Sequence, residues 1–213
     1  MLAALTGTGL SAAAGLNAYI PFLVVALVAR FTDAITLPEG YAWIESWWAI
    51  GIGALLLLVE VVLDKIPVVD SVNDAIQTAI RPATGGLVFA ATQAAEDLEE
   101  STGWFADNPW LGVVVGVVVS AVVHGGKAVA RPAIDAGSLG TATPVVSTAE
   151  DGFSVGLALA AVFWPVLVVV LLVVLAAVLG AGVVVVLRWR RRRAARREGP
   201  GASASGTDRG RTR

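Results

Sequence analysis

The sequence has no cysteine, a single histidine and a single methionine among its 213 residues. The lack of cysteine excludes disulfides, thiolate metal sites and cysteine nucleophiles, and the lone His124 cannot form a zinc site built on paired histidines. Charge is also scarce, because 15% of the residues are charged and 56% are hydrophobic. Together with a mean hydropathy of +0.77, this composition predicts an integral membrane protein.

Basic residues are few until the end of the chain. Residues 1–187 hold five basic and fifteen acidic side chains, whereas residues 188–213 hold ten basic and two acidic ones. No Lys or Arg precedes Arg30, so we expect the N-terminal segment to be retained rather than cleaved as a signal peptide. The sequence predicts a transmembrane helical domain at 1–187 and a basic, disordered tail at 188–213.

The basic run RWRRRRAARR at 188–197 predicts the orientation of the chain. Such a run directly after an apolar segment favours the cytoplasmic side of a membrane. We therefore expect a multi-pass protein of the cell membrane, in a bacterium the inner membrane, with a cytoplasmic C-terminus. The expected partners are membrane lipids, with anionic lipid at the basic tail, and no nucleic acid.

Four apolar segments are long enough to cross a membrane core of about 30 Å. These predicted spans are residues 10–29, 47–63, 108–126 and 166–187. Residues 152–187 as one helix would be about 54 Å long, so we expect a break at Pro165, with residues 153–164 as a kinked extension or a re-entrant arm. The predicted fold class is an all-α polytopic helical bundle of about four full spans plus one or two re-entrant or broken segments, with both termini cytoplasmic.

Residues 75–95, AIQTAIRPATGGLVFAATQAA, have the length of a span but hold Arg81, Pro82, Gly85 and Gly86 in their middle. An arginine at the centre of a bilayer costs about 2.5 to 3.5 kcal/mol, and proline and glycine free backbone groups that lipid cannot satisfy. We expect a helical hairpin that dips in and returns, or a broken helix inside the bundle.

The course of this segment decides which polar groups meet. If it does not cross, the spans at 47–63 and 108–126 are antiparallel, which would suit an inverted repeat. The recurrence of Arg-Pro-Ala at Arg81 and Arg131 is a weak sign of such duplicated halves. If it crosses, the two spans are parallel, and Glu60 could lie near His124 at similar depth. We expect the first arrangement.

Several polar residues have both a structural and a functional interpretation. Glu60 either faces the bundle interior or snorkels to the interface. Asn17, four residues before Pro21, either bonds between helices or faces a cavity. Asp70 either caps a helix that begins near Ser71 or lines a polar entrance.

The predicted polar cavity draws on all these segments. Within STAED at 147–151, the hydroxyl and carboxyl residues either form a capping box or belong to the same entrance. We predict neither a metal ion nor a cofactor. The twelve candidate residues are Asn17, Glu60, Asp70, Asn73, Asp74, Arg81, His124, Lys127, Arg131, Asp135, Glu150 and Asp151.

Small residues recur at four-residue spacing on two of the expected helices. One stripe is Gly7, Ser11 and Gly15, and the other is Gly112, Gly116 and Ser120. Small residues at this spacing let helices approach closely in a membrane. We expect packing within the chain, and a homo-oligomer through these faces is the alternative.

The chain also resembles a known family. GLNAYIPFL at 15–23, DKIPVVDSVND at 64–74, the two Arg-Pro-Ala pieces and STAED at 147–151 are similar to the small bacterial membrane proteins of domain of unknown function 4126. The similarity covers about residues 5–190. It implies a multi-pass membrane protein and brings no activity, substrate or catalytic residue with it.

Three classes of function fit the sequence. A small transporter or channel for a solute, ion or lipid headgroup explains polar residues at membrane depth, and it is our prediction. A structural or assembly protein without transport is the alternative. An intramembrane metal-dependent lipid enzyme is the third class, with Asp70 and Asp74 as carboxylates for Mg²⁺, and we expect it least.

Overall fold

The computed structural model describes residues 2–64, 66–97, 108–138 and 141–197. All the regular structure in these ranges is helical, which confirms the predicted all-α fold class. The elements are α1 (Leu2–Leu16), α2 (Tyr19–Phe31), the 3₁₀ helix η1 (Ala42–Glu45), α3 (Trp47–Leu63), α4 (Pro67–Asp97), α5 (Pro109–Ser138), α6 (Thr143–Phe163) and α7 (Pro165–Arg197).

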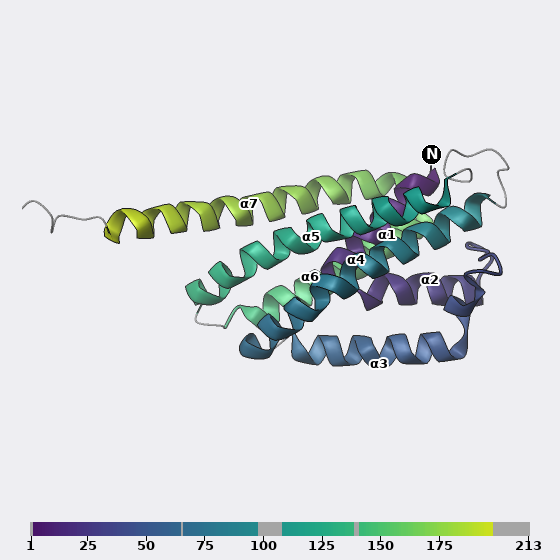
Figure 1. The fold of residues 1–213 in the computed structure, drawn as a ribbon, viewed down its shortest axis with the longest axis horizontal. Coiled ribbons are helices and arrows are strands. Elements are labelled where there is room, and N and C mark those ends of the chain that lie inside the picture. Colours follow the sequence, from purple (N-terminus) through teal and green to yellow (C-terminus); the bar gives the residue numbers. More distant parts are fainter. Residues whose placement is uncertain (1, 65, 98–107, 139–140, 198–213) are drawn as a thin grey trace, which may run out of the picture.

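Successive α-helices run in alternating directions along the bundle (Figure 1). The start of α1 and the junction of α6 with α7 lie at one end, which we call the N-terminal end. The exposed Arg188 and Arg191 of α7 lie toward the other end, which we call the basic end. The two ends of the described helical bundle therefore lie apart, whereas we expected four full spans that leave both termini on one side. Three differences from the expected spans contribute: the chain reverses between α1 and α2, α4 is one continuous helix, and α6 is a separate long helix.

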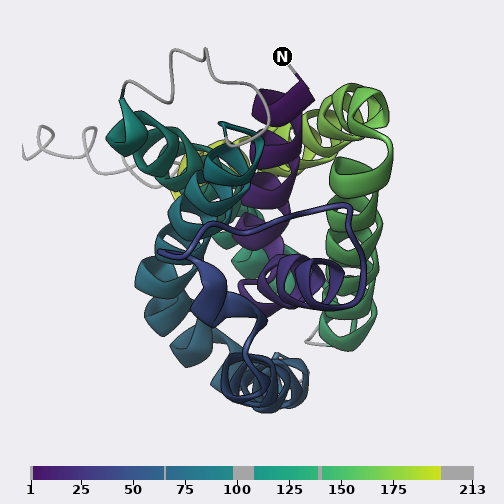
Figure 2. The ribbon, with the colours of Figure 1, turned by 90° about the vertical axis from the view of Figure 1, so that its right-hand side faces the viewer.

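Helix α1 lies at the centre of the bundle, among α4, α5, α6 and α7 (Figure 2). Its residues from Leu10 to Ala14 are all 0% exposed. Small residues permit this burial, because a Cβ on Gly15 would lie only 2.6 Å from the Cβ of Val123, and one on Gly7 would meet the ring of Phe89 at 2.8 Å. The predicted stripe on α1 is thus a packing face within the chain.

The second small-residue stripe has the same role between α4 and α5, which form the most extensive helix contact in the bundle. A Cβ on Gly116 would collide with the carbonyl oxygen of Gly85. Ser120 Oγ donates a hydrogen bond to the carbonyl oxygen of Arg81 at 2.8 Å. Both stripes therefore pack against other helices of the same chain, and the alternative of a homo-oligomer stays a prediction.

The predicted span at 10–29 is two helices, not one. If the helix continued, Pro21 would have to donate to the carbonyl oxygen of Asn17, which proline cannot do. Instead, Asn17 Oδ1 accepts hydrogen bonds from the backbone N–H of Tyr19 at 3.1 Å and of Ile20 at 3.3 Å, so it caps α2. The chain turns back there. The start of α1 and the segment after α2 therefore lie close together, and Thr6 and Ile35 line the same small hollow.

The segment at 75–95 is part of one continuous helix, so the predicted hairpin is wrong. α4 runs for 31 residues with Pro82 in its interior. The expectation that this segment lies inside the bundle is met, because α4 packs on α1 and α5. Gly85 and Gly86 serve this packing rather than a turn, since Cβ atoms there would collide with Ser120 and Val117 of α5. Arg81 is 0% exposed, and protein groups rather than lipid surround it.

The predicted break at Pro165 is present between α6 and α7. However, α6 begins at Thr143, so residues 153–163 are the second part of a 21-residue helix rather than a short arm, and Trp164 follows its end. The capping-box interpretation of STAED is likewise wrong, because these residues lie inside α6. At its far end, α7 extends beyond the predicted boundary at Leu187 to Arg197, so residues 188–197 are helical, and residues 198–213 lie outside the described residues.

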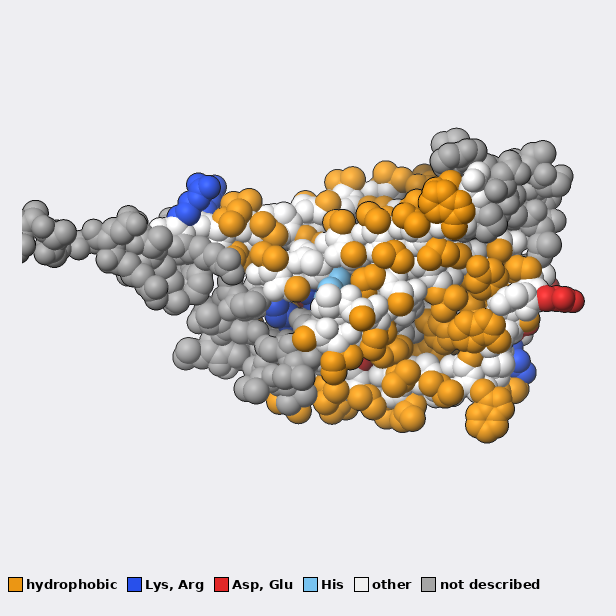
Figure 3. Space-filling model, viewed as in Figure 1, with side chains coloured by type: hydrophobic (Ala, Val, Ile, Leu, Met, Phe, Trp, Pro, Cys, Tyr) orange, Lys and Arg blue, Asp and Glu red, His pale blue; other side chains and the backbone are white. Residues whose placement is uncertain are grey.

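The exterior of the bundle suits a membrane protein. Three helical segments, Trp110–Arg131, Thr143–Phe163 and Pro165–Arg188, are long and apolar enough to cross a membrane, and Tyr19–Phe31 and Trp47–Leu63 are shorter apolar helices. Figure 3 shows hydrophobic side chains over the middle of one face, with most of the visible charge toward the two ends. One exception is a group of basic side chains in a hollow beside the only histidine (Figure 3).

Candidate functional site

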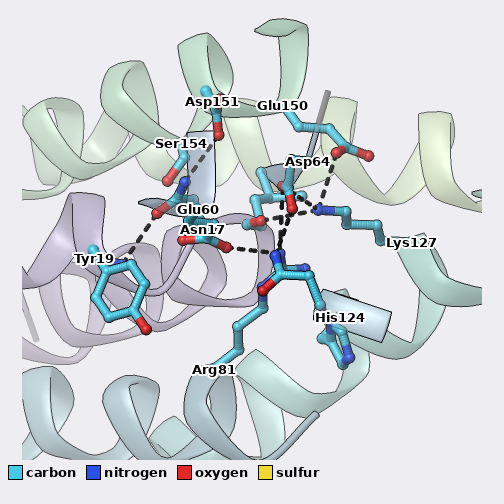
Figure 4. A network of polar contacts seen from close by, with 12 residues as sticks. Asn17, Tyr19, Glu60, Asp64, Arg81, His124, Lys127, Glu150, Asp151 and Ser154 are labelled. Carbon is cyan, nitrogen blue, oxygen red and sulfur yellow. Dashed lines mark hydrogen bonds and ion pairs between the residues drawn. The ribbon is translucent and has the colours of Figure 1, made fainter. Parts of the chain in front are cut away.

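Charged side chains from four helices form one buried chain of ion pairs in which acid and base alternate (Figure 4). We call it the polar network, and it comprises, in order of contact, Glu60, Arg81, Asp64, Lys127, Glu150 and Arg131. Its three cations are three of the five basic residues that precede Arg188. Most of the positive charge that precedes Arg188 is therefore inside the bundle.

The deepest part of the polar network joins α3, α4 and α5. Arg81 Nη2 donates to Glu60 Oε1 at 2.8 Å, and the two side chains are 0% and 1% exposed. Arg81 Nη1 lies 3.1 Å from His124 Nδ1. A guanidinium only donates, so Nδ1 accepts, and the imidazole is neutral with its proton on Nε2. Nε2 then donates to Thr78 Oγ1, which lies 3.1 Å away.

Asp64 holds the middle of the polar network. Its carboxylate lies 3.8 Å from both Arg81 Nη2 and Lys127 Nζ, and Oδ1 accepts a hydrogen bond from Asn73 Nδ2 at 2.7 Å. Asp64 is 1% exposed and directly follows α3. A carboxylate this deeply buried depends on such partners, because burial without them costs several kcal/mol.

The outer part of the polar network joins α5 and α6 through one carboxylate oxygen. Glu150 Oε2 lies 3.1 Å from Lys127 Nζ and 3.0 Å from Arg131 Nη1. Lys127 Nζ also donates to the carbonyl oxygen of Leu16 at 3.3 Å, and Arg131 Nη2 donates to that of Asp64 at 3.4 Å. Both cations are therefore also held by groups other than Glu150.

The break between α1 and α2 lies against this network. Lys127 meets the carbonyl end of α1 at Leu16, where the helix dipole is negative and favours a cation. On the other side, Asn17 Nδ2 donates to Asp151 Oδ1 at 2.9 Å. Ser154, one turn further along α6, donates from Oγ to the carbonyl oxygen of Ala13 at 3.0 Å. Side chains of α5 and α6 thus satisfy the end of α1, whereas the start of α2 is satisfied by Asn17, which Asp151 of α6 holds in place.

Nine of the twelve predicted residues gather in this region. They are Asn17, Glu60, Asn73, Arg81, His124, Lys127, Arg131, Glu150 and Asp151. Asp70 and Asp74 lie in α4 and Asp135 in α5, but their side chains are outside the described ones. The backbone excludes one interpretation, because α4 begins at Pro67 and Asp70 therefore does not cap a helix that starts near Ser71.

Sequence reasoning missed three members of this region. Asp64 was not among the twelve candidates, although its spacing of four from Glu60 places it on the same helical face. Thr78 lies three residues before Arg81 on α4, and Ser154 lies three after Asp151 on α6, so the same spacing rule could have found both. Their partners are 46 and 141 residues away in sequence.

A cavity of about 290 Å³ adjoins the outer part of the polar network. Its charged wall is Lys127, Arg131 and Glu150. The rest of its lining is apolar and comes from the end of α1, α5, α6 and α7, namely Leu16, Ala130, Val146, Ala149, Phe153, Leu175, Val178, Leu179 and Gly182. The polar residues therefore converge beside a cavity instead of scattering to separate caps.

The described residues contain no group of three or more His, Cys, Asp or Glu arranged to hold a metal ion. Comparisons with curated proteins and with solved structures gave no match. A family model described as Domain of unknown function (DUF4126) matches residues 4–185. This range covers α1 from its third residue, all of α2 to α6 and most of α7, including every residue of the polar network. The chain therefore belongs to the family of domain of unknown function 4126, as the resemblance in its motifs predicted.

Proposed function

We propose that this protein is a small membrane transporter or channel that carries an ionic or amphipathic solute past the polar network. The observation that carries the proposal is the end of α1 inside the bundle, where Lys127 meets its last carbonyl group and a cavity opens beside it. Helices that stop inside a membrane and present their ends to charged groups are typical of transporter binding sites.

The depth of the polar network supports this proposal. Exposed tryptophans, including Trp48 and Trp110, gather at the N-terminal end of the bundle, as is typical of a membrane interface. At a rise of about 1.5 Å per residue, His124 lies about 21 Å and Arg131 about 32 Å along α5 from Trp110. If Trp110 marks one interface of a hydrocarbon core of about 30 Å, Arg131 would lie at the other interface. The network would then extend from that interface through roughly a third of the thickness of the core.

The orientation follows from the basic end. Arg188 and Arg191 are exposed there, and the positive-inside bias places them in the cytoplasm, where they would attract anionic lipid. The polar network would then open toward the cytoplasm. Toward the opposite side, the apolar core around Leu10 and Val88 would keep the pathway closed in this conformation.

Reconstitution into liposomes tests the proposal. Release of potassium, chloride, inorganic phosphate, acetate and decanoate would be compared between liposomes with and without the protein. We expect at least one of these solutes to cross faster with the protein, and Lys127→Met to reduce that flux at least tenfold. Lys127→Arg, which keeps the charge, should retain more of the flux than Lys127→Met.

The control is Thr148→Ala, because this exposed residue of α6 bonds only to its own helix through Pro144 in the described structure. Its flux should equal that of the wild type. A panel in which no solute crosses faster than in empty liposomes, or an unchanged flux in Lys127→Met, would contradict transport. The structural alternative would then hold, with the network serving only to fix the helix arrangement.

A further inference from the structure

We propose that the cavity beside the polar network binds an anionic amphiphile with one alkyl chain, whose acidic headgroup replaces the Glu150 carboxylate between Lys127 and Arg131. This inference rests on the proposed function in that it names the class of substrate. Binding itself requires no transport and can be tested separately.

The lining of the cavity has two chemically distinct parts. Nine of its residues are apolar, and the three charged ones lie together where α5 faces α6. A volume of about 290 Å³ is at the lower end of the range for small-molecule sites, about 300 to 1,000 Å³. This space suits an alkyl chain with a charged group at one end, since each buried methylene contributes favourably and the headgroup needs a polar partner.

The charge of the wall selects an anion. Two cations, Lys127 and Arg131, share a single oxygen of Glu150, at 3.1 and 3.0 Å. A ligand carboxylate or phosphate placed there would meet the same two donors, and Arg131 offers the planar fork that suits such oxyanions. A ligand cation would be repelled by Lys127 and Arg131, and Glu150 is the only carboxylate among the residues that line the cavity.

Glu150 can leave while both cations stay. Its side chain is 18% exposed, whereas those of Lys127 and Arg131 are 1% and 4% exposed. The cations also contact the carbonyl oxygens of Leu16 and Asp64, respectively. The carboxylate of Glu150 therefore acts as an internal substitute for the ligand headgroup, and it competes with that headgroup for the two donors.

The mouth of the cavity faces the apolar exterior. Val178 of α7 is 63% exposed, and Ala149 of α6 is exposed as well, so the opening lies between these two helices. Neighbouring residues of α7 such as Val174 and Val185 are also exposed. A ligand would thus enter from the lipid, with its headgroup toward the basic end and its chain toward Leu175.

Photocrosslinking tests the inference on the full-length protein in phosphatidylcholine liposomes. The probe is hexadecanoic acid with a diazirine in the middle of its chain, and the comparison is the matching alcohol, which has no charge. We expect the acid to label Phe153, Leu175 or Leu179 at least five times more strongly than the alcohol does. Equal labelling by the two probes, or labelling spread over the exposed face of α3, would overturn the inference.

Variants separate the role of each charged group. Lys127→Met should lower labelling at least fivefold, while Glu150→Gln should raise it at least twofold, because the competing carboxylate is gone. A loss of labelling in Glu150→Gln would show that Glu150 supports the site and would contradict the competition. Val178→Trp should block the mouth and lower labelling. Thr148→Ala, exposed on α6 and outside the lining of the cavity, should leave labelling unchanged.

Two further comparisons distinguish the possible outcomes. An excess of inorganic phosphate should not displace the acid, and displacement would mean that the site takes a free anion rather than an amphiphile. Specific labelling without flux of any solute would support this inference and contradict transport. Flux of a small ion without specific labelling would support transport and contradict this inference.

Discussion

Arg81 Nη2 lies 2.8 Å from Glu60 Oε1, and this buried ion pair joins two helices that otherwise touch little. α3 packs mainly on α2 and η1 and meets α4 at only a few places. Because Glu60 and Gly53 are the buried residues of α3, the ion pair is a main link between this peripheral helix and α4.

Replacing one partner of this pair should therefore cost stability. Glu60→Met leaves the Arg81 charge buried without its carboxylate at 2.8 Å, and such a loss typically costs about 3 to 5 kcal/mol in the free energy of unfolding. The double variant Glu60→Met/Arg81→Met should be closer to the wild type, because no buried charge of the pair is left over. Denaturant unfolding in detergent measures the free energy of unfolding of the two single variants, Glu60→Met and Arg81→Met, and of the double variant, each against the wild type.

The control for these single and double variants is Val59→Ala. Val59 is next to Glu60 on α3 and is 44% exposed. This substitution should change the free energy of unfolding by no more than about 0.5 kcal/mol. If the loss in free energy of unfolding of the double variant equals the sum of the losses of the single Glu60 and Arg81 variants, the two residues are not coupled and the prediction is wrong.

Two glycines of α5 should respond to alanine in opposite directions. Gly116→Ala places a methyl group against the carbonyl oxygen of Gly85 and should cost about 1 to 3 kcal/mol. Gly125→Ala has nothing within 4 Å of the new methyl group and should gain about 0.5 to 1 kcal/mol. Thermal unfolding of the two variants in the same detergent compares them, and a similar response would argue against the close contact of α4 with α5.

Asn17 should matter beyond its own helix. Asn17→Ala removes the cap of α2, worth about 0.5 to 2 kcal/mol, and also the bond to Asp151. Thr8→Ala on α1 is the control, since Thr8 Oγ1 bonds to Ala4 within the same helix. Unfolding midpoints should fall clearly for Asn17→Ala and little for Thr8→Ala. Equal midpoints would contradict the capping role.

The reversal at Asn17 can be tested by labelling, because the chain has no native cysteine. Single cysteines at Gly40 and Thr141 occupy exposed positions near the N-terminal end and the basic end, respectively. In intact cells, a membrane-impermeant thiol reagent should reach Gly40→Cys from outside, whereas Thr141→Cys should react only after the membrane is opened. Labelling of both from the same side would contradict the proposed orientation.

Some elements could be predicted from the sequence because their causes are local. The span at 47–63 has the same bounds as α3, since its apolar run follows Ser46, whose hydroxyl accepts from the backbone N–H of Ala49. Pro165 ends α6 for an equally local reason, because proline cannot donate to the preceding turn.

Other elements depend on residues that are distant in the sequence. Residues 10–29 look like one span by hydropathy, but Asn17 is bonded to Asp151, 134 residues further on. For Arg81 in α4, sequence reasoning considered only the cost of placing an arginine at the centre of a bilayer. In the structure this side chain contacts both Glu60 and His124 instead of lipid. The sequence allowed these two residues to lie near each other if the segment at 75–95 crosses, but we expected the other arrangement.

The candidate site divides in the same way. The residue types were predictable, because charged and amide groups in apolar helices need partners. Their pairing was not, since Glu150 binds cations 19 and 23 positions before it in the sequence. The cavity also required the structure, because it exists where α1 stops and α7 covers the space between α5 and α6.

The central place of α1 has a consequence for how the protein is made. This helix precedes in the chain all four helices that surround it, so during synthesis it must wait in the membrane or the insertion machinery until α7 has emerged. The same holds for Lys127 and Arg131, because both pair with Glu150, which is translated after them. Closure of the fold is therefore a late event, and a chain interrupted before α6 would leave buried charges for quality control to detect.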